Sequence, residues 1–579
     1  MKKTIAFLLS LVMVFTSLSI LTLGVTADEP EAPLPGTTAY EDALKAAGYV
    51  GVDSFGSMED FSETGKYYLT QDFVLPDSES NHGYLRGVEF KGILDGNGHT
   101  VYNAKFALFN NLKGTIKNLV FSKYTNQEET EAFVTKQSLL NGISDGALLE
   151  NVTSNRKFDE NISDYWGTIV RDVPANATVT FRNVTNNSSI AFPYTAYNIK
   201  IGGFIGLART NSTIIFENCV NNGNVKGSQA GGFIAVLLGG NTVSFENCAN
   251  NGTVIGSIGS NGTLDGAYGI AGGFIGSYNN AYKRDTSLNI SFENCVNTGD
   301  VIRWEGAYQP TKKDHKVAQG GFIGNLGEGS NQYPLTLSVK NCTVSDCQIG
   351  AGTSWSDKID ESTGVVAIDY TQGYVGAIAG WFGTGNNSGQ DSVTIENVIV
   401  RNVTIESADP AFASLFLNTN NDAVKTVNLK ECFAISCDEI RAATGNVKFT
   451  HTASSEAVTV NKTQKSAVAD DKMALRFLGT IDSLNYQGIG FVVEEKIEDN
   501  KSYYFLYNKK AYNEVINGTG KLTKVDLGGN YITAAVLENV SATNTKKVTY
   551  TVTPYAINLE NSAIVGTAKS ISLTAGNLS

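Results

Sequence analysis

The middle of the chain repeats itself at intervals of 29 residues or more. The segment Ile215–Asn221 reads IFENCVN, and related segments begin at Ser244, Ser291 and, more loosely, Ser338. Its first Asn recurs in a wider set of units, at positions 118, 151, 183, 218, 247, 294, 341 and 397. A Gly-Gly-Phe-Ile block precedes this Asn, with Phe at 204, 233, 274 and 322, and an apolar residue follows it at 225, 254, 301 and 349. Three short apolar runs separated by Gly and Asn are typical of β-strands joined by tight bends.

A unit of three short strands cannot bury an apolar face alone, but it can when it stacks on copies of itself. Each strand then hydrogen-bonds to its equivalent in the next coil, and the Asn side chains at the bends can form a ladder of amide hydrogen bonds. A β-sandwich needs antiparallel hairpins, and propeller blades repeat at about 40–50 residues. The repeat therefore predicts an all-β chain built on a parallel β-helix over residues 51–450.

Three segments near the start of this region resemble segments of known proteins. They are KYYLT at Lys66–Thr70, FKGILDGNGHTV at Phe90–Val101 and GTIKNL at Gly114–Leu119. Together they resemble the opening of GLUG-repeat and pectate-lyase-like β-helix proteins. The resemblance implies a right-handed parallel β-helix in a surface protein of a Gram-positive bacterium. These families include adhesin-like proteins, accessory regions of secreted proteases and polysaccharide-degrading enzymes, so the resemblance leaves the function open.

The two ends of the chain differ from the repeat. Lys2 and Lys3, an apolar run and small residues before Asp28 predict a signal peptide over 1–27, followed by an acidic linker and short cap over 28–50. After a linker at 451–472, strand-like runs over 473–579 predict a small Ig-like β-sandwich. We expect a secreted protein, extracellular or associated with the cell surface, with no membrane span after signal cleavage.

Composition excludes some classes of partner. Charged residues make up 17% of the chain, and 44 Lys and Arg against 57 Asp and Glu give a formal charge of -13. Nucleic-acid binding needs clustered basic residues, so we expect no nucleic-acid partner. With four His and no C-x-x-C spacing we expect neither a metal nor any other cofactor.

Seven cysteines remain to be explained in a chain expected to be exported. Cys219, Cys248, Cys295 and Cys342 occupy one register of the repeat, where other units have Val or Leu. This alternation favours buried free thiols that act as small hydrophobic residues. One or two disulfides remain an alternative, for example within Cys342/Cys347 or Cys432/Cys437, and a metal site is a weaker one.

The repeat also contains insertions at one recurring place. From the third apolar residue to the next Phe or its equivalent, the gap is 8 residues at 225→233, then 20, 21 and 29 residues in the next three units. Stacked coils lie about 4.8 Å apart, so three consecutive insertions must form one surface. Insertions on one face of a repeat array often mark its binding face.

The inserted segments are rich in aromatic and acidic residues, which suit the apolar faces and hydroxyl rims of sugars. The alternative is that the aromatics only pack the loops onto the wall. The candidate ligand-binding residues are Tyr268, Trp304, Tyr308, Trp355, Asp357 and Tyr370.

We therefore predict an exported, adhesin-like binding protein, whose β-helix scaffold presents loops to a polysaccharide, a host or cell-surface glycan, or another surface polymer. One alternative is a β-helix polysaccharide lyase or glycoside hydrolase, for which loop carboxylates could act in pairs. No catalytic signature is evident, so no catalytic residue is proposed. A second alternative is a purely structural spacer.

Overall fold

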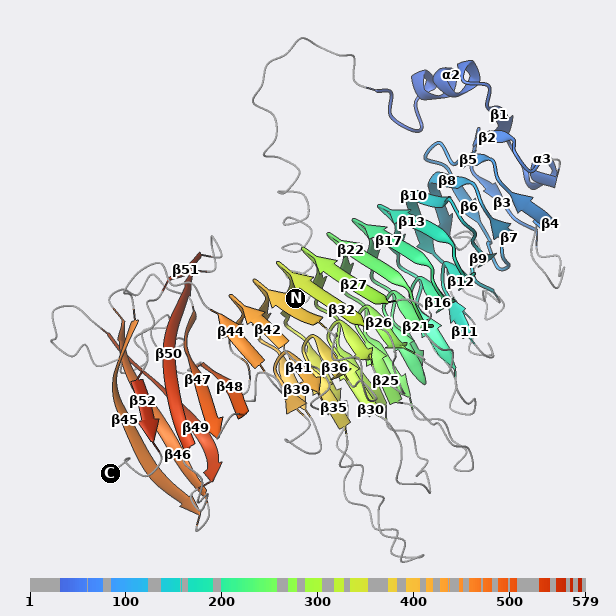
Figure 1. The fold of residues 1–579 in the computed structure, drawn as a ribbon. Coiled ribbons are helices and arrows are strands. Elements are labelled where there is room, and N and C mark those ends of the chain that lie inside the picture. Colours follow the sequence, from blue (N-terminus) through green and yellow to red (C-terminus); the bar gives the residue numbers. More distant parts are fainter. Residues whose placement is uncertain are drawn as a thin grey trace, which may run out of the picture.

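The computed structural model (Figure 1) is almost entirely β. It describes residues 32–59, 61–76, 85–122, 137–156, 158, 165–190, 199–257, 269–278, 287–304, 317–326, 334–351, 373–382, 392–406, 413–419, 427–435, 437, 447–450, 458–469, 472–481, 488–497, 500–507, 531–541, 548–558, 563–565 and 571–574.

Over most of the described chain the strands stack in parallel, each on its equivalent one coil away (Figure 1). Four parallel sheets run along this stack in the described ranges, and this confirms the predicted all-β chain with stacked parallel sheets. We name them the long sheet, the ten-strand sheet, the seven-strand sheet and the five-strand sheet.

The strands of the long sheet are β1 (Val50–Val52), β2 (Lys66–Leu69), β3 (Phe73–Val74), β5 (Ile93–Asp95), β6 (Thr100–Tyr102), β8 (Thr115–Ser122), β10 (Ala147–Asn155), β13 (Thr178–Arg182), β14 (Thr185–Asn186), β17 (Thr213–Glu217), β18 (Val220–Asn221), β22 (Thr242–Glu246), β23 (Ala249–Asn250), β27 (Leu288–Glu293), β28 (Val296–Asn297), β32 (Leu335–Lys340), β33 (Thr343–Ser345), β37 (Ser392–Glu396), β38 (Ile399–Arg401), β42 (Val427–Lys430), β43 (Phe433–Ile435) and β44 (Val447–Thr450). The strands of the ten-strand sheet are β4 (Leu85–Phe90), β7 (Phe109–Leu112), β9 (Leu140–Gly142), β12 (Val170–Val173), β16 (Ile205–Ala208), β21 (Ile234–Leu237), β26 (Ile275–Tyr278), β31 (Ile323–Asn325), β36 (Ala379–Phe382) and β41 (Leu417–Thr419).

The strands of the seven-strand sheet are β11 (Tyr165–Gly167), β15 (Lys200–Gly202), β20 (Gln229–Gly231), β25 (Gly269–Gly272), β30 (Val317–Gly320), β35 (Gly373–Gly376) and β40 (Ala413–Ser414). The strands of the five-strand sheet are β19 (Val225–Gly227), β24 (Val254–Ser257), β29 (Val301–Trp304), β34 (Gln348–Ala351) and β39 (Thr404–Glu406).

Residues at equivalent positions of the sequence repeat pair with one another on successive strands. Phe216 pairs with Phe245, and Phe245 with Phe292, on successive strands of the long sheet. Their rings stack with centroids 4.9 and 4.8 Å apart. The Phe residues of the Gly-Gly-Phe-Ile blocks form a second stack that meets the first edge-on, for example at 5.3 Å between Phe216 and Phe233. Both stacks are buried and form the centre of the core.

The recurring Asn marks a sharp bend in the long sheet. At all eight repeat positions this residue has a φ of 52–54°, the left-handed region that Asn tolerates better than other side chains. The side chains also bond to one another, as predicted. Asn151 Nδ2 donates to Asn118 Oδ1 at 2.8 Å, and Asn183 Nδ2 donates to Asn151 Oδ1 at 2.8 Å.

A second amide ladder runs inside the core, three residues after the bend. Asn186, Asn221 and Asn250 are fully buried, and each donates to the next Asn along the stack at 2.7–2.8 Å. Asn221 also donates to the carbonyl of Gly223, and Asn250 to that of Gly252, both at 3.0 Å. These amides therefore satisfy polar backbone groups inside an otherwise apolar core.

The cysteines are free, and six of the seven are buried. The Cys219 backbone N–H donates to Cys248 Sγ at 3.4 Å, and the Cys295 N–H donates to Cys342 Sγ at 3.4 Å. This stack confirms the predicted common register. Burial raises the pKa of Cys432 to about 12, so this thiol stays protonated and unreactive in the folded chain.

A short cap precedes the first coil. It contains α2 (Thr38–Ala46) and α3 (Phe55–Glu59). The Tyr40 hydroxyl in α2 donates to Asp95 Oδ2 at 2.8 Å, and the Gly36 N–H donates to Asn97 Oδ1 at 2.8 Å. Asp95 is fully buried and also pairs with Lys117 Nζ at 3.1 Å, so α2 is held on the solenoid by a charged network.

The C-terminal region forms two antiparallel sheets. The first contains β45 (Val458–Ala469), β46 (Lys472–Ile481) and β49 (Tyr531–Ser541). The second contains β47 (Gly488–Ile497), β48 (Asn500–Tyr507), β50 (Val548–Asn558), β51 (Ala563–Val565) and β52 (Ile571–Thr574).

The predicted linker at 451–472 needs correction. Most of that stretch is β45, which pairs in antiparallel fashion with β46. The alternation of Val458 and Val460 with polar residues is a strand pattern, and the richness in Ser, Lys and Ala obscured it. Among the described residues, no helix is long and apolar enough to cross a membrane.

Candidate functional site

The predicted insertions begin at adjacent points of the solenoid. In the five-strand sheet, Ser257 at the end of β24 pairs with Trp304 of β29, and Arg303 pairs with Ala351 of β34. The segments 258–268, 305–316 and 352–372 start directly after these paired residues. Their departure points are therefore separated by the coil spacing, about 4.8 Å.

The insertions also rejoin the solenoid side by side. The chain re-enters at β25, β30 and β35, where Gly269 pairs with Val317, and Val317 pairs with Gly373. Both ends of all three insertions thus lie in register at one place, which we call the insertion corner. The structure brings the anchors of the predicted site together as the repeat spacing required.

The candidate ligand-binding side chains are mostly beyond the described ranges. These are Tyr268, Tyr308, Trp355, Asp357 and Tyr370. Trp304 is the last residue of β29, and only its backbone is described. Their role in binding stays a prediction.

The coil before the insertions shows the corner in its shortest form. There, β19 ends at Gly227, β20 begins at Gln229, and Ser228 alone joins them. Ser228 is buried, and its hydroxyl donates to the Ile199 carbonyl at 2.8 Å. A single residue is therefore enough to close this corner, and the longer segments are not required for the coil to form.

Two further segments at this corner escaped the sequence analysis. The segment 191–198 follows Ile190, which pairs with Val225 of β19, and 407–412 follows β39. The repeat spacing could have revealed both segments, because Ile190 stands seven residues after Asn183 and Ile405 stands eight residues after Asn397. Tyr194 and Tyr197 lie in the first of these segments.

Behind the corner, the seven-strand sheet packs against the ten-strand sheet through polar and aromatic contacts. Gln229 of β20 is buried, and its Oε1 accepts a hydrogen bond from the Ser277 hydroxyl of β26. Trp381 stacks on Tyr374 with ring centroids 4.8 Å apart. Trp381, one of the aromatic residues that the sequence places near the insertions, thus packs on the wall.

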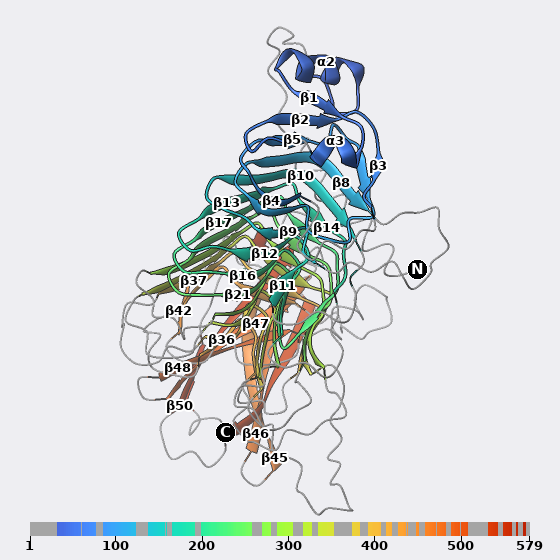
Figure 2. The same cartoon turned by 90° about the vertical axis from the view of Figure 1, so that its right-hand side faces the viewer.

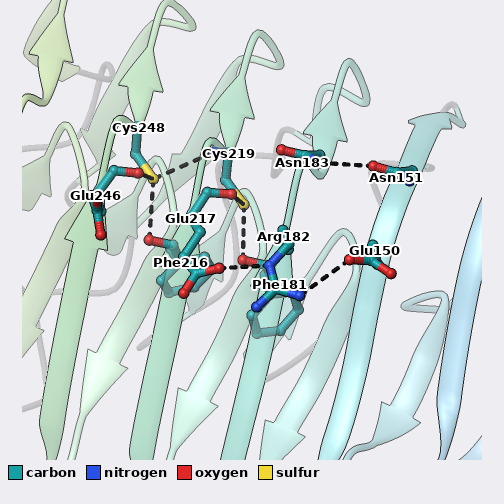
Figure 3. Close-up of polar contacts among 10 residues, drawn as sticks. All are labelled: Glu150, Asn151, Phe181, Arg182, Asn183, Phe216, Glu217, Cys219, Glu246 and Cys248. Atoms are coloured by element: carbon teal, nitrogen blue, oxygen red, sulfur yellow. Dashed lines mark hydrogen bonds and ion pairs between the residues drawn. The ribbon is translucent and has the colours of Figure 1, made fainter. Parts of the chain in front are cut away.

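The outer face of the long sheet carries a row of charged residues at a single register position (Figure 3). Arg182 lies between two carboxylates: its Nε donates to Glu217 Oε2 at 2.6 Å, and its Nη1 donates to Glu150 Oε1 at 3.1 Å. These hydrogen bonds raise the pKa of Arg182. Glu246 and Glu293 continue the row on the next two strands.

A parallel row two residues earlier on the same face contains hydroxyl groups, such as those of Thr180, Ser244 and Ser291.

Within the described ranges, no cluster of three or more His, Cys, Asp or Glu side chains forms a metal site. The charged row of Arg182 and its two partners consists of ion pairs that stabilise the stack, and those groups already bond to each other.

Comparisons with known proteins add little to this geometry. The sequence matches no known family profile and no curated protein sequence. Among solved structures, the chain is similar to a crystal structure from Bacteroides ovatus, of a protein assigned provisionally as an immunoglobulin A1 protease. The two are 14% identical with a TM-score of 0.32, over 48% of this chain and 84% of that chain. At this level of similarity no activity is transferred.

Proposed function

We propose that this chain is a binding protein of adhesin type, in which a β-helix scaffold presents the insertion corner to a polysaccharide or a surface glycan. The observation that supports this proposal is the register at both ends of the three insertions, from Ser257 and Trp304 to Gly269 and Val317. Loops anchored in adjacent coils form one continuous surface, and aromatic residues there suit sugar rings.

The proposal includes export. The N-terminal residues 1–27 act as a signal peptide, and the mature protein is extracellular or held at the surface of a Gram-positive cell.

The proposal also includes the fold families. The solenoid belongs with the GLUG-repeat and pectate-lyase-like right-handed β-helices. The C-terminal sheets form an Ig-like β-sandwich.

Binding to a glycan array tests the site. The wild-type protein is expected to retain a defined set of glycans, and Trp304→Ala and Trp355→Ala are each expected to weaken retention at least tenfold, about the loss of one stacked aromatic contact. Trp381→Phe is the matched control, because this Trp packs on Tyr374 in the wall. Retention that is unchanged in both Trp304 and Trp355 variants contradicts the assignment.

An incubation of the purified wild-type protein with polysaccharides distinguishes binding from catalysis. Incubation with pectins, glycosaminoglycans and plant glucans is expected to leave the polymers intact. Unsaturated or newly formed reducing ends would instead identify a lyase or hydrolase at the corner. Absence of any retained glycan, together with intact polymers, would favour the structural spacer.

A further inference from the structure

Four of the buried cysteines form one unbroken row inside the solenoid. They follow the bend Asn in four successive coils, which Figures 1 and 2 show stacked along one axis, and they are Cys219, Cys248, Cys295 and Cys342. Each of these side chains is at most 1% exposed. The row stops at both sides on an apolar residue of the same register, Val184 and Val398.

The sulfurs repeat with the coil spacing. Cys219 Sγ lies 3.4 Å from the Phe181 carbonyl oxygen of the preceding coil, and the equivalent distances for Cys248 and Cys295 are 3.6 and 3.5 Å (Figure 3). The three side chains therefore have the same orientation, and neighbouring sulfurs are separated by the coil repeat. The stacked Phe rings three residues earlier give this repeat, since their centroids are 4.9 and 4.8 Å apart.

Backbone N–H groups point at the same sulfurs. The Cys219 N–H donates to Cys248 Sγ and the Cys295 N–H to Cys342 Sγ, both at 3.4 Å, so Cys342 continues the row. A donated hydrogen bond favours the charged form of its acceptor. These donors thus favour the thiolate, which is the form of cysteine that binds a metal.

The spacing fits an ion held by two sulfurs. An ion midway between two neighbours would lie about 2.4 Å from each, half the coil repeat, and metal–sulfur bonds are about 2.3 Å long. The described ranges contain no cluster of three or more metal-binding side chains, whereas structural Zn²⁺ and iron–sulfur clusters take four protein ligands. Cu(I) is a soft ion that thiolates select, and it accepts two sulfurs in a line.

We propose that this thiol row binds Cu(I) between neighbouring cysteines, with three ions shared among the four sulfurs. Loading breaks four S–H bonds and forms six Cu–S bonds, and the four protons leave to solvent while copper and sulfur keep their oxidation states. Three Cu(I) and four thiolates carry a net charge of -1, which the N–H donors stabilise. Three divalent ions would instead leave a buried charge of +2, at a higher cost.

The burial of the row determines when it is loaded. Because the thiols are covered in the finished solenoid, the ions enter while the chain folds, and binding then contributes to folding. The cysteines are 29 or 47 residues apart, so no short ligand spacing marks the site in the sequence. The row lies inside the long sheet and is independent of glycan binding at the insertion corner.

Counting copper in refolded variants of the full chain tests the proposal. Each protein is refolded without oxygen in excess Cu(I), supplied as a complex with a chromophoric chelator, and copper per chain is measured after gel filtration. We expect three ions in the wild type and two in Cys219→Val, which shortens the row at one end. Cys248→Val interrupts the row and leaves only the Cys295/Cys342 pair, so one ion is expected. X-ray absorption of the bound copper is expected to show two sulfur neighbours.

The solenoid itself provides the controls. Valine is a matched replacement, because Val184 and Val398 occupy the same register in neighbouring coils. Cys432→Val is the control variant, since Val398 separates Cys432 from the row, and it is expected to hold three ions. Circular dichroism of each refolded protein checks that the solenoid has formed.

Three results overturn the proposal. One is a folded wild type that retains no copper. Another is equal copper content in Cys219→Val and Cys248→Val, because ions shared between neighbours require the interruption to cost more than the shortening. The third is one ion for each of the seven cysteines, which identifies independent capping of single thiols.

Discussion

At the scale of single residues, the bends of the solenoid depend on a conformation that few side chains accept. The repeated Asn was recognisable in the sequence because its spacing is tied to the apolar runs. Its positive φ and the outer amide ladder follow from that position. The ion pairs at the position just before the repeated Asn could not be predicted. Glu, Arg and Lys occupy this position in no regular order, and only the strand pairing shows which of them are neighbours.

A substitution at Asn151 tests the bend directly. Asn151→Ala is expected to destabilise the chain by about 1–2 kcal/mol, because alanine lacks the short polar side chain that lets Asn tolerate the left-handed conformation. Asn151→Gly is the matched control and is expected to cost less, because glycine adopts φ near the observed 54° freely. Denaturant unfolding of both variants measures the difference, and an alanine variant as stable as the glycine variant would contradict this account.

The Tyr40 hydroxyl predicts a pH dependence of the N-terminal cap. Burial, and then Asp95, raise the pKa of Tyr40 from 10.0 to about 12. Because the folded pKa lies above the unfolded value, the stabilisation is complete below pH 10 and is lost as the pH rises through about 12. A dye attached at Asp42→Cys, an exposed position of α2, is expected to lose anisotropy in that window.

The background variant Tyr40→Phe supplies the control for this titration. It has no phenol to ionise, so the anisotropy change between pH 10 and about 12 is expected to disappear. The same transition with and without the hydroxyl would show that another group controls the cap.

At the scale of strands and ladders, the inner Asn row carries more energy than the outer rows. Asn250 is fully buried and bonds to Asn221, Gly252 and Asn297. The sequence shows a pair of Asn residues here, at 250 and 251, but not which of them points inward. The bend at Asn247 decides this, because it resets the alternation of inward and outward side chains.

Asn250→Ala is therefore expected to cost about 3 kcal/mol or more, since several buried polar groups lose a partner and each costs about 1–3 kcal/mol. Asn251→Ala removes one amide of a second outer row, distinct from that of the bend residues, in which Asn251 Nδ2 donates to Asn222 Oδ1 at 2.9 Å. Its expected cost is below about 1 kcal/mol. Equal losses of unfolding free energy in the two variants would contradict the division into a buried inner row and less buried outer rows.

At the scale of the whole molecule, the period of the sequence predicted the stacked parallel sheets and the common origin of the three insertions. It could not predict that β47 and β48 contact the last strands of the long sheet, because these contacts are made by residues with no periodic relation to the repeat. The boundary at 451–472 was misplaced for a similar reason. A strand of alternating Val and polar residues, β45, has a composition like that of a linker.

The central claim is that the solenoid is a scaffold and that the insertion corner binds the ligand. Replacing 257–269, 304–317 and 352–373 each by one Ser copies the coil in which Ser228 alone joins β19 to β20. These bounds follow from the strand pairing, in which Gly256 is equivalent to Gly227 and Ile270 to Gln229. This variant is expected to keep the far-ultraviolet circular dichroism and the thermal midpoint of the wild type, and to lose retention on a glycan array. Retention equal to that of the wild type in the folded variant would contradict the claim.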